Sequence, residues 1–187
     1  MKNTTASMRL GKFEFFAMNN PLREWRMKHR EFPLLNKMLR GHRIDLSGRT
    51  IVDMGCGSGL SSGLLLEQLR PSRVIAFDIM PEQISLAKKR RLNIDFRLGN
   101  ALAIDLPDSG CDAVFDFGIL HHIPQWRKAI TESARVLVPG GIVFIEEPHK
   151  LFEWDELELG IQEAGFEIIE RAQWYRGFFR FFLARKI

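Results

Sequence analysis

The sequence predicts an α/β fold built on a doubly wound, mostly parallel sheet. From residue 50 onward, short apolar segments alternate with stretches whose apolar residues recur every three or four positions, the patterns of buried strands and of amphipathic helices. Strands joined through helices run parallel, with right-handed crossovers. Near the end, only Arg176-Gly177 separates two strand-like segments, and so short a link demands an antiparallel hairpin.

Five strands and three helices are expected in the alternating part of the chain. The strands are residues 50–54, 73–77, 94–98, 112–117 and 141–146, and the helices are residues 60–69, 81–92 and 126–137. Each strand is short and apolar, as expected when helices cover both faces of the sheet. A further helix with Trp154, Leu157, Ile161 and Ala164 on one face precedes the hairpin, whose strands are expected at residues 166–175 and 178–185.

The segment before the first strand is predicted to be helical. Pro21 opens a stretch in which Leu22, Trp25, His29 and Phe32 share one face. Pro33 should break or kink it, and a second short helix should carry Leu34, Leu35, Met38 and Leu39 and end at Gly41. The 187 residues suit a single domain, with an N-terminal helical extension at residues 1–45 and a core at residues 46–187.

Composition and charge exclude several classes of protein. The apolar content of 45% and charged content of 27% are globular, not disordered or coiled-coil. Two cysteines, Cys56 and Cys111, cannot form a disulfide framework or a four-ligand zinc site by themselves. No apolar run has the ~18 residues of a membrane span and the N-terminus lacks an apolar signal core, so we expect a cytoplasmic protein. The net charge of +4 divides into +7 over residues 1–50 and −3 over residues 51–187.

A glycine-rich loop joins the first expected strand to the first helix. Gly55, Gly57 and Gly59 occupy alternate positions, which lets the backbone turn sharply and approach a ligand at the carboxyl edge of the sheet. No lysine follows Gly59, which argues against a nucleoside-triphosphate P-loop. The dinucleotide spacing G-x-G-x-x-G is not matched. The loop therefore suits a different nucleoside ligand, and the alternatives are a degenerate NAD site and an ordinary βα turn.

Asp78 stands at the tip of the second expected strand. Its carboxylate can accept hydrogen bonds from both hydroxyls of a ribose lying across the neighbouring strand ends. The alternative is a cap for the helix that begins at Pro81. The distance of nineteen residues from Gly59 suits the next strand tip and favours the ribose role.

These motifs together resemble the class I S-adenosylmethionine-dependent methyltransferases. The resemblance is carried by the glycine loop with Asp53, then Asp78, Gly99-Asn100-Ala101, Gly118-Ile119-Leu120-His121-His122 and Pro139-Gly140-Gly141. It covers roughly residues 45–187 and is closest in pattern to the small-molecule group that includes the ubiquinone and menaquinone biosynthesis enzymes. It implies a Rossmann-like, seven-stranded sheet with a C-terminal antiparallel hairpin and helices on both faces.

The resemblance also implies the cofactor, S-adenosyl-L-methionine, and a set of residues that bind it. Gly55, Gly57 and Gly59 would pack against its methionine part, next to Asp53, and Asp78 would hold the ribose. Ile79 would flank the adenine, and Asn100 and Ala101 would recognise its edge. The family usually has Asp at the position of Asn100, although an amide oxygen can still accept from an exocyclic amine. Phe117 would touch the methionine part or line the acceptor pocket.

Candidate catalytic groups follow the fourth and fifth strands. His121 or His122 can serve as a general base, since an imidazole titrates near ~6.5; the alternative is that they cap a helix or pack beneath the N-terminal segment. Glu146, Glu147 and His149 are further candidates, and a solvated strand end is the simpler interpretation for at least two of them. The spacing of these groups gives no metal site.

The acceptor pocket is predicted to come from the N-terminal segment. An apolar lid of Phe13, Phe15, Phe16, Met18, Leu22 and Trp25 would be lined by polar Asn19, Asn20, Arg23 and Arg26. This favours methyl transfer to a small organic or lipid-like acceptor; a solvated helix packed on the sheet is the simpler alternative. An RNA or protein methyltransferase that uses the basic N-terminus and a noncatalytic cofactor-binding module stay open. The oligomeric state cannot be read from the sequence.

Overall fold

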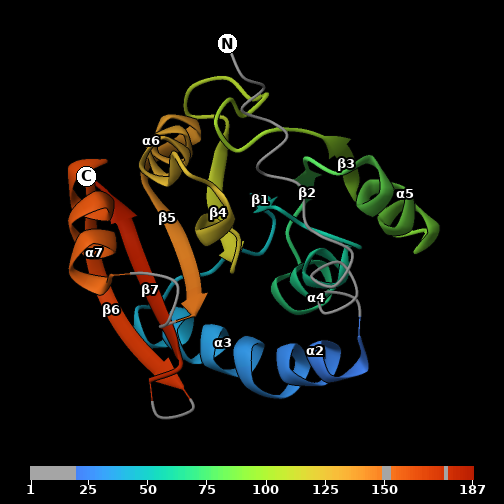
Figure 1. Ribbon diagram of the computed structural model, residues 1–187, viewed down its shortest axis with the longest axis horizontal. Coiled ribbons are helices and arrows are strands. Elements are labelled where there is room, and N and C mark those ends of the chain that lie inside the picture. The colour runs from blue at the N-terminus through green and yellow to red at the C-terminus, as the bar shows by residue number, and fades with distance from the viewer. Residues whose placement is uncertain (1–19, 149–152, 175–176) are drawn as a thin grey trace.

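The computed structural model describes residues 20–148, 153–174 and 177–187, which form one seven-stranded sheet with helices on both faces (Figure 1). The strand order is β3-β2-β1-β4-β5-β7-β6. The strands are β1 (Thr50–Met54), β2 (Arg73–Asp78), β3 (Asp95–Leu98), β4 (Cys111–Phe117), β5 (Leu137–Pro148), β6 (Phe166–Trp174) and β7 (Phe179–Lys186). The predicted doubly wound sheet is confirmed.

The first five strands are parallel, and β7 inserts between β5 and β6 in antiparallel pairing with both. The predicted hairpin is therefore confirmed. Because the chain winds outward from β1 to β3 and then returns to β4, the strand order reverses between β1 and β4. Ligands of open α/β sheets bind at the carboxyl ends of the strands beside such a reversal.

Two layers of helices cover the sheet. The first layer contains α3 (Phe32–Gly41), α4 (Leu60–Leu69) and α5 (Pro81–Lys89), and the second contains α6 (Trp126–Val136) and α7 (Trp154–Glu163). Alternate strand residues face opposite layers: Phe115 and Phe144 pack with α3, whereas Val114 and Val143 pack with α6 and α7. The same alternation continues to the strand ends, where it divides the polar residues of the site between the two faces.

The helical part of the N-terminal segment differs from the prediction. A helix runs through α2 (Pro21–Arg26), a π-helical turn η2 (Met27–Glu31) and α3 without a break at Pro33. Proline has no N–H to donate to the previous turn, and the wider π turn just before it accommodates this loss. The extra residue rotates the buried face, so the predicted apolar stripe is wrong for Leu22 and Trp25, which are 73% and 47% exposed. Phe32 is buried as predicted, and Met27, outside the predicted stripe, is buried with it.

Some element ends also differ. The helix predicted over residues 81–92 ends at Lys89, just before Arg91 takes a left-handed conformation with φ of 54°. The strand predicted over residues 141–146 spans Leu137–Pro148, because β4 pairs with it on one side and β7 on the other. Both cysteines are buried and unbonded to each other. Within the described ranges, no helix is both long and apolar enough to cross a membrane.

Candidate functional site

The glycine loop lies at the reversal of strand order, between β1 and α4. Gly55, Gly57 and Gly59 all have positive φ, at 72°, 52° and 79°, a conformation that strains residues with a Cβ. The amides of Gly55 and Cys56 donate to the carbonyl of Phe77 at 2.8 and 3.0 Å, which folds the loop over the end of β2. A Cβ at Gly55 would lie 2.5 Å from Cγ2 of Ile119, so this glycine also permits close packing against the loop after β4.

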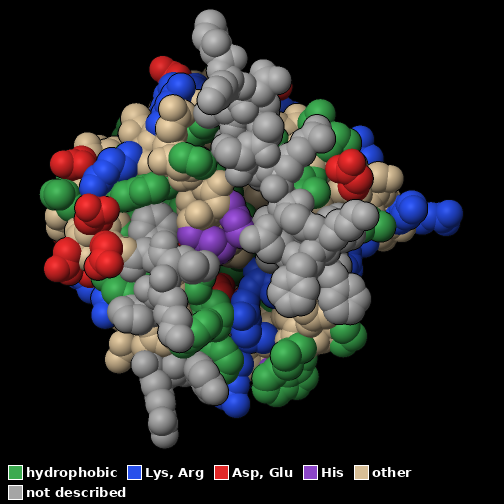
Figure 2. All heavy atoms as spheres, viewed as in Figure 1, with side chains coloured by type: hydrophobic (Ala, Val, Ile, Leu, Met, Phe, Trp, Pro, Cys, Tyr) green, Lys and Arg blue, Asp and Glu red, His purple; other side chains and the backbone are tan. Residues whose placement is uncertain are grey.

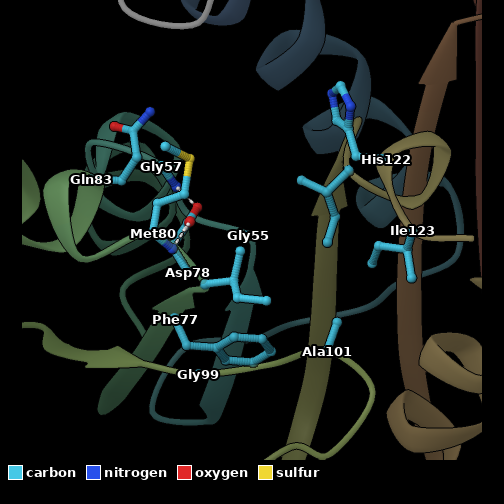
Figure 3. A pocket seen from close by; sticks show the side chains of 12 residues that line it. Gly55, Gly57, Phe77, Asp78, Met80, Gln83, Gly99, Ala101, His122 and Ile123 are labelled. Atoms are coloured by element: carbon cyan, nitrogen blue, oxygen red, sulfur yellow. Dashed lines mark hydrogen bonds between the residues drawn. The ribbon is translucent and has the colours of Figure 1, made fainter. Parts of the chain in front are cut away.

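A cavity opens between this loop and the ends of β2, β3 and β4 (Figure 3). It encloses about 570 Å³, part of it open to solvent, which is within the usual size of a small-molecule site. Its wall is mostly apolar, with one carboxylate at Asp78. The lining residues are Gly55, Gly57, Phe77, Asp78, Ile79, Met80, Gln83, Gly99, Ala101, Ile119, His122 and Ile123.

Asp78 joins the glycine loop to the residue before α5 and also lines the cavity. One oxygen, Oδ2, accepts from the amide of Gly57 at 2.9 Å, and Oδ1 accepts from the amide of Met80 at 2.9 Å, at the start of α5 (Figure 3). The carboxylate therefore fixes both the glycine loop and the helix start. Burial raises the pKa of Asp78 above its usual 3.8. Each oxygen has a second lone pair, so a ligand hydroxyl in the cavity can still be bound.

The structure brings Ile79 and Ala101 to the cavity wall, and it adds Gly99. A Cβ at Gly99 would lie 3.0 Å from Cβ of Phe77, so a side chain there would collide with the wall. Asn100 does not line this cavity: its Oδ1 accepts from the amide of Leu102 at 2.9 Å and stabilises the turn after β3. The turn that Asn100 holds places Ala101 at the wall.

Three further predicted cofactor contacts stand apart from the cavity. Gly59 begins α4, where a Cβ would lie 2.9 Å from the ring of Phe96. Asp53 is buried behind the loop, and its Oδ2 accepts from the hydroxyls of Ser61 and Ser62 at 2.7 and 2.5 Å. Neither residue lines the cavity, so both act through the loop that they support. The ring of Phe117 stacks on Phe32 at 5.3 Å and packs into the core.

Asp53 gives a pH-dependent prediction. Burial raises its pKa from 3.8 to about 6, against the opposing hydrogen bonds from Ser61 and Ser62. The folded protein therefore binds this proton more tightly than the unfolded chain, and the free energy of unfolding falls as pH rises from about 4 to 6. In Asp53→Asn this loss is absent, so the stability of the variant relative to wild type should rise by on the order of 3 kcal/mol over that window.

Urea unfolding at pH 4 and pH 7 measures this difference. Asp95→Asn is the matched control, because Arg97 lowers the pKa of Asp95 to about 2 and its contribution is nearly constant over the same window. An equal change in both variants would contradict the assignment to Asp53.

The N-terminal helix covers the other side of the glycine loop. A smaller space there is lined by Arg23 and Met27 of the helix, by the loop and by Phe117. The guanidinium of Arg23 donates to the carbonyl of Phe117 at 3.0 Å, which ties the helix to the end of β4. The structure thus places Arg23 and Met27 beside the glycine loop, and the role of the segment as a lid over the acceptor stays a prediction. The predicted lid residues Phe13, Phe15, Phe16, Met18 and Asn19 fall outside the described residues.

The two histidines follow β4 in the short helix η3 (Leu120–His122). Their rings are 3.9 Å apart. His122 lines the cavity, and Nδ1 of His121 lies 2.6 Å from Oε2 of Glu147. Figure 2 shows histidine side chains in a hollow near the centre of one face, with Lys and Arg side chains beside it.

Buried acids at the strand ends are the feature that the sequence reasoning missed. Glu146 and Glu147 are 1% and 0% exposed, so the solvated strand end predicted for them is wrong. Asp116, at the end of β4, is also fully buried. Glu146 faces Glu31 and Arg26 of the N-terminal helix, with Arg26 Nη2 at 3.8 Å from Oε1. The apolar run before each acid is the sequence signal that could have predicted this burial. A strand whose two faces are both covered by helices continues to be covered at its end.

His149 is outside the described residues, so its position is not assigned. In the part of the chain that the structure describes, no three acidic, histidine or cysteine side chains gather in a way that could hold a metal ion.

Known proteins resemble this chain in sequence. Residues 52–145 match a family model described as a methyltransferase domain. A fatty-acid O-methyltransferase of Mycolicibacterium smegmatis is 26% identical over 129 residues, which is 68% of this chain and 47% of that protein. A phthiotriol/phenolphthiotriol dimycocerosates methyltransferase of Mycobacterium tuberculosis is 34% identical over 101 residues, which is 53% of this chain and 37% of that protein. The chain thus spans less than half the length of these relatives.

The fold is also found in solved structures. The crystal structure of a SAM-dependent methyltransferase from Aquifex aeolicus superposes with a TM-score of 0.80 at 17% identity, covering 96% of this chain and all of that one. The family match spans β1 to β5, and so includes the glycine loop, Asp78 and the histidine pair. The chain therefore belongs to the methyltransferase domain family and has the fold of S-adenosylmethionine-dependent methyltransferases.

Proposed function

We propose that this chain transfers a methyl group from S-adenosyl-L-methionine to a small, partly apolar acceptor. The observation that carries the proposal is the cavity at the reversal of strand order, with the positive-φ glycine loop on one side and the half-buried Asp78 carboxylate on the other. It lies within the part of the chain that matches the methyltransferase domain. A fold of this kind hosts several functions, so the site supplies the argument.

The residues present fit this cofactor. Asp78 would hold the ribose hydroxyls, Ile79 and Ala101 would contact the adenine, and the backbone of Gly55 and Gly57 would lie against the amino-acid part. The backbone of Gly57 is open to close approach by the cofactor. A Cβ added there would meet only the side chain of Gln83, at 4.0 Å, and would itself fill the open space beside the loop. The sulfonium supplies its own leaving group. The protein then mainly aligns the reactants and excludes water, which can contribute as much as ~7–11 kcal/mol.

A groove beside the N-terminal helix supports the class of acceptor. It is lined by Leu22 and Trp25 of α2 and by Trp174, Phe178 and Phe179 of the hairpin, and it encloses about 700 Å³, part of it open to solvent. Arg23 lines both this groove and the smaller space against the glycine loop, so the two are adjacent. Aromatic walls with the guanidiniums of Arg23 and Arg26 suit an apolar molecule that carries an anionic or polar group.

Two of the relatives are named as a fatty-acid O-methyltransferase and a phthiotriol/phenolphthiotriol dimycocerosates methyltransferase. Both names agree with a partly apolar acceptor. The narrower resemblance to the ubiquinone and menaquinone biosynthesis enzymes belongs to the same proposal, since their acceptors are also partly apolar.

Two measurements test the proposed function. Calorimetry with S-adenosylmethionine should show binding, and incubation with the methyl-labelled cofactor and fractionated cell extract should place label in small, organic-soluble molecules. Label in RNA or protein would favour the alternative methyltransferase, and binding without transfer to any fraction would favour a noncatalytic module. Absence of cofactor binding would overturn the proposal entirely.

Trp25 gives a prediction for the groove. Trp25→Ala should raise the KM for the labelled organic fraction about tenfold, since losing part of one aromatic contact costs on the order of 1–2 kcal/mol. The affinity for S-adenosylmethionine should stay unchanged, because Trp25 does not line the cofactor cavity. Leu159→Ala is the control, since Leu159 is 48% exposed on α7, outside the groove. Equal KM values for both variants would place the acceptor elsewhere.

A further inference from the structure

Two buried carboxyl groups share one face of the sheet at the ends of β4 and β5. Asp116 is the register partner of Ile145, and Glu147 lies two residues beyond Ile145 on the same strand. Side chains two apart on a strand point to the same face, so Asp116 and Glu147 both face η3 and α7. Glu146 immediately precedes Glu147 on β5, so its side chain points to the opposite face of the sheet, toward Glu31. The two acids beneath η3 therefore form a group of their own.

Glu147 is held in place by η3. Its Oε1 accepts from the amide of Leu120 at 2.7 Å, and its Oε2 lies 2.6 Å from Nδ1 of His121. Asp116 accepts from the amide of Ile119 through Oδ1 at 2.9 Å, while its Oδ2 is buried with no donor among the described residues. Both acids are 0% exposed, and their carboxyl groups are close enough to share a proton.

Asp116 is the member of this pair that is protonated more readily. Burial, and then the charge of Glu147, raises the pKa of Asp116 well above its usual range. Burial also raises the pKa of Glu147, to about 8, but the backbone N–H groups of Leu120 and His121 favour its ionised form. Other titratable or charged groups lie nearby: the ring of His122 lies 3.9 Å from that of His121 at a tilt of 44°, and Arg180 on β7 is the cross-strand partner of Glu147. The charge of Arg23 on α2 also favours ionised Glu147.

We propose that Glu147, supported by Asp116, is a positioning residue that holds His121 with its proton on Nδ1, so that Nε2 takes a proton from the methyl acceptor. The inference rests on the proposed function and deepens it. Above its pKa of about 8 the ionised carboxylate of Glu147 only accepts, so the nitrogen facing it, Nδ1, must carry the hydrogen and the lone pair lies on Nε2. The ring is 13% exposed, so it is not sealed within the core.

Methyl transfer with His121 as the base moves one proton and one methyl group. The acceptor's X–H bond breaks and its proton moves to Nε2 of His121, while the X electron pair forms the bond to the methyl carbon. The bond between that carbon and sulfur breaks, and its electron pair stays on sulfur. Glu147 stabilises the resulting imidazolium. The acceptor atom is therefore one that must lose a proton: a hydroxyl, an acidic carbon or an ammonium. A carboxylate or a thiolate needs no such base.

The first test needs neither cofactor nor acceptor. Nitrogen-15 NMR of the histidine rings should show His121 of the wild-type protein with hydrogen on Nδ1 at about pH 9, where Glu147 is ionised. In Glu147→Gln and in Asp116→Asn the single tautomer should give way to a mixture or to the other form, whereas Glu147→Asp should restore it at least in part. An unchanged His121 tautomer in Glu147→Gln would overturn the proposal. His122→Ala, which leaves the carboxyl pair intact, is the control.

The second test uses the holoenzyme and two defined probes of similar length, 4-nonylphenol and decanoic acid. Removing a general base costs about 10²–10⁴-fold in rate, so His121→Ala should lose methyl transfer to the phenol by that factor. Glu147→Gln should lower kcat at least tenfold, change the shape of the pH profile and leave KM unchanged. His122→Ala should have a smaller effect on kcat than His121→Ala.

The outcomes separate the inference from the proposed function. A normal pH profile and kcat in Glu147→Gln, or transfer to decanoic acid alone, would overturn the inference while the function stands. Loss of S-adenosylmethionine binding in the wild-type protein would overturn the proposed function, and the NMR result would still decide whether Glu147 fixes His121. If neither probe is methylated, the NMR measurement alone decides.

Discussion

Replacing Asp78 by alanine is expected to weaken S-adenosylmethionine binding by about 10²–10³-fold. A hydrogen bond to a charged group contributes about 1.5–3 kcal/mol, and loss of one or two of them accounts for this factor. The variant also removes the acceptor for the amides of Gly57 and Met80, so the cofactor cavity loses part of its shape. Calorimetric titration measures the affinity, and thermal unfolding reports the separate effect on stability.

Two variants control for this experiment. Asp78→Asn keeps the size of the side chain and one acceptor oxygen, so its affinity should fall between those of wild type and Asp78→Ala. Asp95→Ala removes a carboxylate from β3, where it pairs with Arg73 and Arg97 outside the cavity, and should bind the cofactor normally. An Asp78→Ala protein that is folded and binds with wild-type affinity would exclude the ribose assignment.

Gly55→Ala is expected to destabilise the protein by about 2–5 kcal/mol. A positive φ costs a residue with a Cβ about 1–2 kcal/mol, and forcing a methyl group into a packed site costs a further 1–3 kcal/mol. Both costs apply at Gly55, where φ is 72° and the added Cβ would lie 2.5 Å from Cγ2 of Ile119. Displacement of Ile119 would also narrow the cavity, so cofactor affinity should fall with stability.

Gly48→Ala separates the two costs. Gly48 has nearly the same φ, 71°, but a Cβ there would meet nothing within 4 Å. Its variant should therefore lose only the conformational part, about 1–2 kcal/mol, and should bind the cofactor normally. Denaturant unfolding of the two proteins gives the difference. If both lose the same stability, the close approach of Gly55 to Ile119 has no energetic importance.

Local pattern was sufficient for most of the fold because its elements are short and repeat with clear periods. The helix predicted at residues 60–69 has those ends in the structure. The short link predicted at Arg176-Gly177 correctly implied the antiparallel hairpin, although β6 ends at Trp174 and β7 begins at Phe179. The N-terminal helix was harder to place. One π turn before Pro33 shifts the buried face, and a period of 3.6 residues cannot anticipate an inserted residue.

Much of the lining of the candidate cofactor cavity could be predicted from the sequence because it depends on backbone shape. Glycines at alternate positions and an acid at a strand tip are local requirements, and the structure places Gly55, Gly57, Asp78, Ile79 and Ala101 around one cavity. Gly59, Asp53 and Asn100 share the motif but support the wall from outside, a distinction that depends on where each side chain points.

The sequence by itself determined the sheet, the position of its ligand-binding edge and the family. Only the tertiary structure decided which polar side chains at that edge are buried and paired. Asp116 belongs to β4 and Glu147 to β5, thirty-one positions apart, and the parallel register together with the alternation of strand faces brings them under His121. Such pairing arises from contacts between distant segments, and no local pattern encodes it.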